Sequence, residues 1–465
     1  MENEELEIIT HSKGTMASFA FGTFLNEFLW MAFSAFAFFF YEAEVGLNIV
    51  LVGIAFVIYA VWNAVNDPLI GYLTNRPFKF TKRWGRRFPW ILIGGLLWTI
   101  SYFLLFAPPD IDPVAGEWIL FGWLLFALCL FDTFCSLFWV NYTSLTPDKF
   151  RSPEERRTSN GMNIVIGSLG TVSGAIVPPL FIIFGVKFSY IISAGVVFLI
   201  AIIALTISLP GSRDEEEYVD RYLENYEEQS EKTSFFKTLK TSMKQKNFVA
   251  YVIVLLTYQV MARSMTASIP YIARYVLLVE ATAITIIMGS LLLALIICTP
   301  FWVKYAQKSN NNRKVILITG FLLVIVTIPL IFVNTIEGFI IGMIFWGSAM
   351  GGFWAMQTIC LTDIIDEAVV DTCERQEGTY NGISMFFSRL AIAVQAVSFA
   401  IVHELTGFVE GSDTQSTQAI IGIKIHFAVI PLFVLLIGML IFYKLYDLTP
   451  EKTKENQIKL KKMCI

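Results

Sequence analysis

Apolar runs of about 20 residues recur along almost the whole of this 465-residue chain, and each is long enough to cross a bilayer. Only 15% of the residues are charged, whereas a soluble domain carries roughly 25%. The mean hydropathy of the chain is +0.63. Within lipid, a helix satisfies its own backbone hydrogen bonds, so runs of this length predict membrane-spanning helices. We therefore expect an all-α membrane protein.

Polar breaks divide the apolar runs into about twelve expected spans: 15–41, 48–75, 88–107, 118–146, 160–184, 188–209, 247–273, 281–304, 314–333, 338–364, 379–404 and 419–445. Six spans precede the long polar segment 210–246, which we interpret as a solvated linker rather than a regulatory domain, and six follow it. The pattern predicts two six-helix bundles, 15–209 and 247–446, between a polar N-terminus (1–14) and a polar tail (447–465).

Lysine and arginine are distributed unevenly among the short turns. The turns at 76–87, 149–157 and 304–314 are rich in both, whereas alternate turns such as NTIEG contain neither. Basic turns stay on the cytoplasmic side, so we expect a multi-pass cell-membrane protein with both termini and the linker in the cytoplasm. The net charge of −4 lies mostly in loops and gives no indication of nucleic-acid binding. We expect a monomer that contacts the lipid bilayer.

The cysteine and histidine patterns argue against an enzyme. Five of the six cysteines lie within or beside apolar segments, without the spacing of a disulfide framework or a metal site. His11, His403 and His426 show no metal-ligand spacing and belong to no nucleophile triad. We expect no metal centre, no cofactor and no enzymatic activity.

The segment 61–90 contains polar residues within an apolar helix, followed by a basic loop. Asn63, Asn66 and Asp67 have i, i+3 and i+4 spacing, which places them on one helix face. A carboxylate inside a membrane is costly to keep and marks a path for ions or substrates. This stripe is therefore a candidate site.

Three motifs carry a resemblance to a known family. They are NDP-x-x-G at 66–71 with RWG at 83–85 and PWILIG at 89–94, the block WAMQTICLTDIIDEAVVDTCERQEG at 354–378, and the looser NYTSLTP at 141–147. On these motifs the chain resembles the glycoside–pentoside–hexuronide:cation symporters of the major facilitator superfamily, the melibiose permease group. The resemblance implies the major facilitator fold, with two pseudo-symmetric bundles that alternate access. It also implies cation-coupled symport of a sugar or a related polar solute.

The resemblance implies a cation site at Asp67 and Asn66, with Ser136 where the family has a hydroxyl ligand. Asn63 stands where sodium-using members usually have a second aspartate. Hard cations prefer charged oxygen ligands, so this exchange favours H⁺ over Na⁺ as the coupling cation. The alternative is that Asp67 is a structural residue, held by hydrogen bonds.

The resemblance also implies substrate residues in the first bundle. Glu27 resembles an acidic sugar-binding residue, although it could instead be a polar packing residue. A family aspartate aligns with Trp139, and Asp132 could replace it from about two turns away. The family's substrate arginine aligns with Asn163.

In the second bundle, Trp354 matches a family tryptophan that borders the sugar, and packing is the alternative role. Arg389 aligns with a cavity-facing lysine. Arg263 lies in mid-span outside any family motif, where it could contact substrate or form an internal salt bridge.

A cytoplasmic gate is expected from charges at the inner ends of the spans. We expect its salt bridges between the bundles to stabilise the outward-open state. Its candidate residues are Arg83, Arg86, Asp363, Asp366 and Arg375.

An amphiphile is the alternative substrate, because an animal lysophospholipid symporter also resembles this family. That function would require a lateral opening and an apolar pocket beside a cationic residue.

Overall fold

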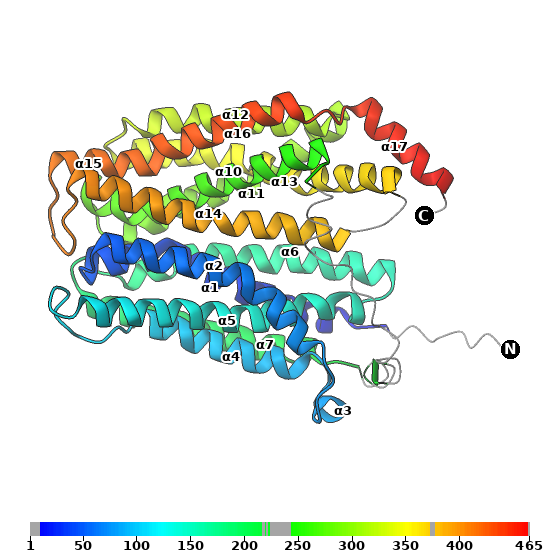
Figure 1. The fold of residues 1–465 in the computed structure, drawn as a ribbon, viewed down its shortest axis with the longest axis horizontal. Coiled ribbons are helices and arrows are strands. Elements are labelled where there is room, and N and C mark those ends of the chain that lie inside the picture. Colours follow the sequence, from blue (N-terminus) through cyan, green and yellow to red (C-terminus); the bar gives the residue numbers. More distant parts are fainter. Residues whose placement is uncertain (1–9, 216–218, 220–221, 224–242, 373–376, 464–465) are drawn as a thin grey trace. The chain divides into compact units, whose positions relative to one another are not determined.

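Helices make up nearly all of the computed structural model, which describes residues 10–215, 219, 222–223, 243–372 and 377–463 (Figure 1). Within these residues, 12 helices are long and apolar enough to cross a membrane. Each of them overlaps one predicted span, and most bounds agree within a few residues. The prediction of an all-α membrane protein with about twelve spans is confirmed.

The helices of the first half run from residue 13 to residue 212. They are α1 (Lys13–Phe39) with the π-helical turn η1 (Phe40–Glu44), α2 (Ile49–Thr74), the short α3 (Thr81–Trp84), α4 (Phe88–Leu105), α5 (Glu117–Lys149), α6 (Pro153–Ile176), η2 (Pro178–Phe181), α7 (Lys187–Ser208) and η3 (Pro210–Ser212).

The helices of the second half follow the linker. They are α10 (Lys246–Tyr271) with the π-helical turn η5 (Ile272–Val276), α11 (Thr282–Ser309), α12 (Asn312–Leu330), α13 (Ile336–Thr372), α14 (Glu377–Thr406), α15 (Thr417–Lys424), η6 (Ile425–Val429), α16 (Ile430–Leu445) and α17 (Pro450–Met463).

The chain divides into two compact units. The first contains Met1–Asn48 and Val61–Glu231, and the second contains Ile49–Ala60 and Lys232–Ile465. The first twelve residues of α2 therefore group with the second unit, because they pack on α14. A Cβ added to Gly53 would lie 3.0 Å from the Cβ of Ala400, and the backbone nitrogen of Ile49 donates to Glu410 Oε1 at 3.0 Å.

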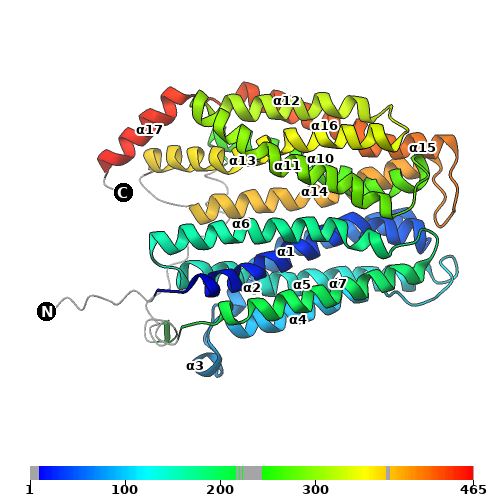
Figure 2. The same ribbon diagram turned by 180° about the vertical axis from the view of Figure 1, so that it is seen from behind.

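Close contact between α1 and α6 organises the first unit. A Cβ added at Gly170 would lie 2.4 Å from the backbone oxygen of Phe24, and one at Gly174 would lie 2.4 Å from that of Phe28. Small residues four apart allow two membrane helices to approach this closely. On the other side of the unit, α4 packs against α5 and α7 (Figure 2).

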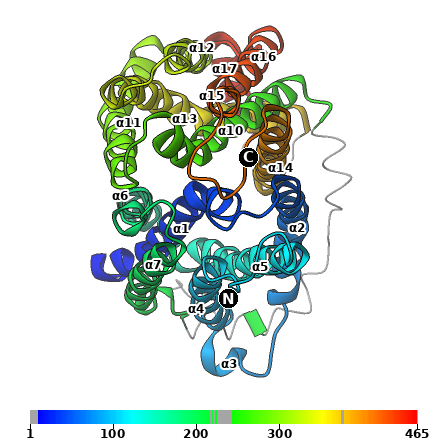
Figure 3. The ribbon, with the colours of Figure 1, turned by 90° about the vertical axis from the view of Figure 1, so that its left-hand side faces the viewer.

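Both units end their first span in the same way. After η1 the chain turns at Gly46 with φ of 80°, and after η5 it turns at Leu278 with φ of 54°. Within the second unit, α12 lies beside α16, as the view along the helices also indicates (Figure 3). The final helix, α17, packs against α13.

Candidate functional site

A buried polar cluster joins α2 to α5 in the first unit. Asn66 Nδ2 donates to Asp132 Oδ2 at 3.1 Å, and Asn63 Nδ2 donates to Asp132 Oδ1. One turn farther along α5, the hydroxyl of Ser136 donates to Asp67 Oδ1. The four predicted cation residues thus lie together, and Asp132, predicted for the substrate, lies among them. We call these five residues the α2–α5 cluster.

Four of the five residues of the α2–α5 cluster are buried. Asp132 is fully buried, Asn63, Asn66 and Ser136 are 1–3% exposed, and Asp67 is partly buried. Every side chain in it carries oxygen, and the donors of these three hydrogen bonds are two amides and a hydroxyl. Carboxylate, amide and hydroxyl oxygens are the ligands that hard cations prefer. Chemically, the cluster can hold a small cation.

Glu27 is held on α1 by residues on two helices. Its Oε1 accepts from Asn26 Nδ2 at 3.1 Å, and its Oε2 lies 3.4 Å from the hydroxyl of Thr171 on α6. Thr171 follows Gly170, so the close α1–α6 contact brings the two together. Thr171 was not predicted from the sequence, because only helix packing brings it next to Glu27.

Two further residues of the first unit lie outside the α2–α5 cluster. Trp139 on α5 stacks on Tyr142, with ring centroids 5.6 Å apart. Asn163 on α6 has a buried Oδ1 that accepts no hydrogen bond from the described residues.

Two arginines lie near each other in the second unit. Arg263 on α10 and Arg389 on α14 are close enough for their charges to repel, and Tyr59 also lies near Arg263. Among the described residues, the buried Arg263 Nε has no hydrogen-bond partner, and no acidic side chain forms an ion pair with Arg263. Two roles were predicted for Arg263, a substrate contact and an internal salt bridge. The described residues contain no such salt bridge.

An apolar groove of about 450 Å³ runs along α14, starting one turn after Arg389. The only residue with a polar side chain in its lining, Ser398, donates its hydroxyl to the backbone oxygen of Gln395 at 2.7 Å, so the groove presents no polar atom. Its lining consists of Val57, Ala393, Val394, Val397, Ser398, Ile401, Val402 and Ile430.

Two residues of α13 present their side chains differently. Trp354 is 48% exposed, which is more than a packed core tryptophan would show. Gln357 is buried, and its Nε2 donates to none of the described residues.

Two of the three predicted gate arginines, Arg83 and Arg86, lie at the basic end of the first unit, where α1, α4 and α6 begin. Arg83 on α3 is exposed. Arg86 donates to Asn75 Oδ1 at 3.0 Å and lies 4.0 Å from Asp148 Oδ2. Its guanidinium also covers the ring of Tyr222, from the linker, at 4.0 Å.

The neighbouring Arg87 was not predicted, although it joins the turn after α2 to α5. It donates to Asn75 Oδ1 at 2.7 Å and to Asn141 Oδ1 at 3.1 Å. Burial, together with the charge of Arg86, lowers the pKa of Arg87 to about 10.

The beginning of the linker is docked on this basic end. Asp214 Oδ2 accepts from the backbone nitrogens of Arg87 and Phe88 at 2.9 Å each, at the start of α4. Gly85, with φ of 89°, makes room for it, since an added Cβ would lie 2.3 Å from Asp214 Oδ2. Burial raises the pKa of Asp214, against the lowering effect of these two donors.

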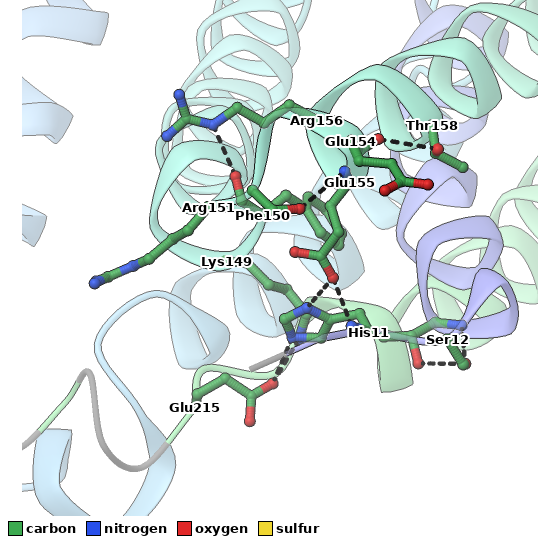
Figure 4. Close-up of polar contacts among 12 residues, drawn as sticks. His11, Ser12, Lys149, Phe150, Arg151, Glu154, Glu155, Arg156, Thr158 and Glu215 are labelled. Atoms are coloured by element: carbon green, nitrogen blue, oxygen red, sulfur yellow. Dashed lines mark hydrogen bonds and ion pairs between the residues drawn. The ribbon is translucent and has the colours of Figure 1, made fainter. Parts of the chain in front are cut away.

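Glu215 extends the docked segment to the N-terminus (Figure 4). His11 lies between Glu155 and Glu215, with 3.2 Å from a ring nitrogen to each carboxylate, and Lys149 Nζ lies 3.2 Å from Glu215 Oε1. Burial acts to raise the pKa of Glu215, but Lys149 and His11 outweigh it, and the pKa is lowered. The start of the expected solvated linker is therefore bound to the bundle.

The remaining gate candidates belong to the second unit. Asp363 Oδ2 accepts from Asn312 Nδ2 at 3.0 Å. Asp363, Asp366 and Lys454 of α17 line a polar cavity of about 620 Å³. Arg375 lies outside the described residues.

Comparison with protein families gives one match that covers almost the whole chain. The model of the family described as MFS/sugar transport protein matches residues 18–450.

Two kinds of curated relative match at similar identity. The sodium-dependent lysophosphatidylcholine symporter 1 of Gallus gallus is 23% identical over 437 residues, which cover 85% of this chain and 79% of that protein. The isoprimeverose transporter of Lactiplantibacillus pentosus is 23% identical over 441 residues, which cover 90% and 86%.

Solved structures of transporters share the fold. A D-xylose-proton symporter matches with a TM-score of 0.64 and 14% identity, over 95% of this chain and 97% of that chain. The nucleoside transporter NupG matches with a TM-score of 0.59 and 12% identity, over 92% and 99%. These matches confirm the predicted major facilitator fold.

Proposed function

The chain belongs to the MFS/sugar transport protein family, and we propose that this transporter carries an amphiphile with a polar head across the membrane together with a cation. It is a transporter and not an enzyme. Among its relatives are sodium-dependent lysophosphatidylcholine symporters, and a lysophospholipid is the amphiphile that we propose.

The apolar groove beside Arg389 is the observation that carries this proposal. Ala393, Val397 and Ile401 follow Arg389 at four-residue spacing, so all lie along one face of α14. A charged group at one end of a groove without polar atoms suits a ligand with a charged head and a hydrocarbon tail. Each CH₂ of a tail that leaves water contributes about 0.8 kcal/mol.

The position of Arg263 favours a substrate whose polar head carries an anionic group. A buried guanidinium needs a counter-charge or water, and the described residues provide Arg263 with no acid. The planar fork of a guanidinium matches the oxygens of a phosphate. Two arginines near each other repel, and an anion between them would relieve that repulsion.

The α2–α5 cluster supports cation coupling. We propose that Asp67 holds the coupling cation with Asn66, Asn63 and Ser136, and that the occupied site favours substrate binding. By linkage the substrate then tightens cation binding equally.

Uptake of lysophosphatidylcholine into proteoliposomes tests the function. We expect Arg389→Gln to lower uptake at least about tenfold, because a lost charged hydrogen bond costs about 1.5–3 kcal/mol. We expect Val397→Trp to block the groove and lower uptake similarly.

Val165→Trp on α6 is the matched control for the groove. Val165 is 64% exposed and Val397 is 44% exposed, so the same enlargement is made at an exposed position outside the groove. Equal uptake by the two tryptophan variants would overturn the proposal that the groove holds the tail.

A sugar is the second candidate substrate. The isoprimeverose transporter is similar over most of this chain, and Glu27, oriented by Asn26 and Thr171, could accept two sugar hydroxyls. With exposed Trp354 offering a stacking face, this candidate predicts that isoprimeverose is taken up and that Glu27→Gln prevents it. Lysophosphatidylcholine uptake that isoprimeverose does not inhibit would exclude it.

The remaining expectations become proposals about topology. We propose six-helix bundles at 15–209 and 247–446, with both termini and the 210–246 linker in the cytoplasm, because the basic turns lie on that side. We also propose a monomer, with Arg83, Arg86, Asp363, Asp366 and Arg375 in a cytoplasmic gate. Labelling of single cysteines by an impermeant reagent in sealed cells tests the orientation.

A further inference from the structure

We propose that the basic turn between α2 and α4 binds the phosphate headgroups of anionic phospholipids on its side of the membrane. The binding surface consists of Phe78, Lys79, Lys82 and Trp84, and we call it the α3 surface. The inference goes beyond the proposed function, because it concerns the lipids around the transporter and not its substrate or its coupling cation.

The two arginines at the end of this turn are already bound to their own bundle. Arg87 donates to the side-chain oxygens of Asn75 and Asn141. Arg86 donates to Asn75 as well, and its guanidinium lies 4.0 Å from Asp148 Oδ2. This part of the turn therefore has a structural role.

The two lysines earlier in the turn have no such partners. Lys79 and Lys82 are exposed, and neither forms an ion pair with any residue that the structure describes. Residues 76–87 include six basic side chains and no acidic one. A cluster of about four to eight lysines and arginines directly after a membrane-spanning helix is typical of binding to anionic lipids. The positive charge of the two lysines is thus available to a partner outside the protein.

Aromatic side chains hold the turn in place and give it an apolar side. Phe78 stacks on Phe80 with ring centroids 5.3 Å apart, and both meet the ring of Trp90 edge-on, at 5.1 and 5.5 Å. The backbone nitrogen of Phe78 donates to Thr81 Oγ1 at 2.9 Å. Trp84 remains 52% exposed. Tryptophan is enriched where membrane and water meet, so an exposed indole beside lysines suits the headgroup layer.

The position of α3 favours lipid as the partner of this surface. In the view along the helices, α3 lies outside the outline of the other helices of the first unit (Figure 3). The last turns of α2, just before it, expose the apolar side chains of Leu69, Tyr72 and Leu73, each 44–46% exposed. Exposed apolar side chains on a spanning helix suit contact with hydrocarbon. The chain therefore reaches the headgroup layer where the α3 surface begins.

Quenching of tryptophan fluorescence by brominated lipids tests the lipid at this surface. The full-length protein is reconstituted into vesicles that contain brominated phosphatidylglycerol, which is anionic, or brominated phosphatidylcholine, which has no net charge. The emission that Trp84→Phe removes is the part that reports on the α3 surface.

In the wild type, we expect that part of the emission to be quenched at an at least about fivefold lower mole fraction of the anionic lipid. Each lysine near an anionic membrane surface contributes about this factor. Added NaCl should reduce the preference, because salt screens exposed charges.

Removal of the two lysine charges should lower the preference. Lys79→Gln with Lys82→Gln should reduce it at least about fivefold and leave the aromatic contacts in place. Lys304→Gln with Lys308→Gln is the matched control, since both lysines are exposed and lie one turn apart at the end of α11. The control should leave quenching at the α3 surface unchanged. Arg83 stays unchanged in every variant, so the proposed gate is not altered.

Equal quenching by the two lipids in the wild type would overturn the inference, and so would a wild-type preference in the Lys79→Gln, Lys82→Gln variant. Emission that neither lipid quenches would overturn it as well, because an acidic protein segment and not lipid would then cover the surface.

Discussion

Substitution of Gly170 by alanine tests the α1–α6 contact that positions Glu27. The added Cβ would lie 2.4 Å from the backbone oxygen of Phe24, whereas an ordinary contact begins at 3.4 Å. The helices must therefore separate locally by about 1 Å, from 2.4 to 3.4 Å. Because the obstructing atom belongs to the backbone, no side-chain rotation can relieve the overlap.

Two opposing terms set the magnitude of this effect. Overpacking costs about 1–3 kcal/mol, and a gap of 0.5–1 Å weakens the remaining contacts between the helices. Replacing glycine by alanine within a helix contributes about 0.8–1.0 kcal/mol in the other direction. Gly170→Ala should therefore lower the free energy of unfolding by about 0–2 kcal/mol.

Gly161 on the same helix provides the control, because a Cβ added there meets no atom within 4 Å. Gly161→Ala should gain only the stabilisation that comes from the higher helix propensity of alanine. The free energies of unfolding of the two variants should therefore differ by about 1–3 kcal/mol. The assay compares thermal unfolding midpoints of the purified variants. If Gly170→Ala unfolds at or above the midpoint of Gly161→Ala, the inferred helix contact is refuted.

Three further predictions concern the basic end of the first unit. Asp214→Ala should lower the free energy of unfolding by about 1 kcal/mol, because α4 loses its N-terminal cap. Asp214→Asn should lower it much less, because the amide keeps an acceptor oxygen. Equal thermal unfolding midpoints for the two variants would contradict this prediction. Arg87→Lys should lower the free energy of unfolding by about 1–3 kcal/mol, since one ammonium cannot reach both Asn75 and Asn141. A thermal unfolding midpoint equal to that of the wild type would argue against this bridge. Because the folded state lowers the pKa of Glu215, its carboxylate stabilises the fold at pH values above its unfolded pKa of about 4.3, and this stabilisation is lost as the pH falls through the folded pKa. Hydrogen exchange of the docked linker should increase in that acidic range. No increase would count against the Lys149 ion pair.

The spans were predictable because each must present about 20 apolar residues to lipid, and this requirement is visible in the sequence itself. The i, i+3, i+4 stripe also identified Asn63, Asn66 and Asp67 as one face. The sequence could not identify their contact with Asp132, because no local spacing relates residues that far apart. Only the packing of α2 against α5 brings them together.

The docked linker was missed for a different reason. A polar segment such as 210–246 has the composition of a solvated linker, and Asp214 resembles any exposed acid in it. Its role depends on two unpaired backbone nitrogens at the start of α4, which become available only once that helix has formed. Similarly, the apolar groove could not be predicted, because it depends on the path of α14 and on the hydrogen bond from the Ser398 hydroxyl to the backbone of its own helix.

The central claim is cation-coupled symport through the α2–α5 cluster. Its most direct test compares concentrative uptake by the Asp67→Asn variant with that by the wild type. Proteoliposomes containing wild type or variant would receive labelled lysophosphatidylcholine with an inward sodium gradient, an inward proton gradient or neither. We predict that the wild type accumulates substrate only with a cation gradient, and that Asp67→Asn equilibrates substrate without accumulating it. Accumulation by Asp67→Asn equal to that of the wild type would contradict the account.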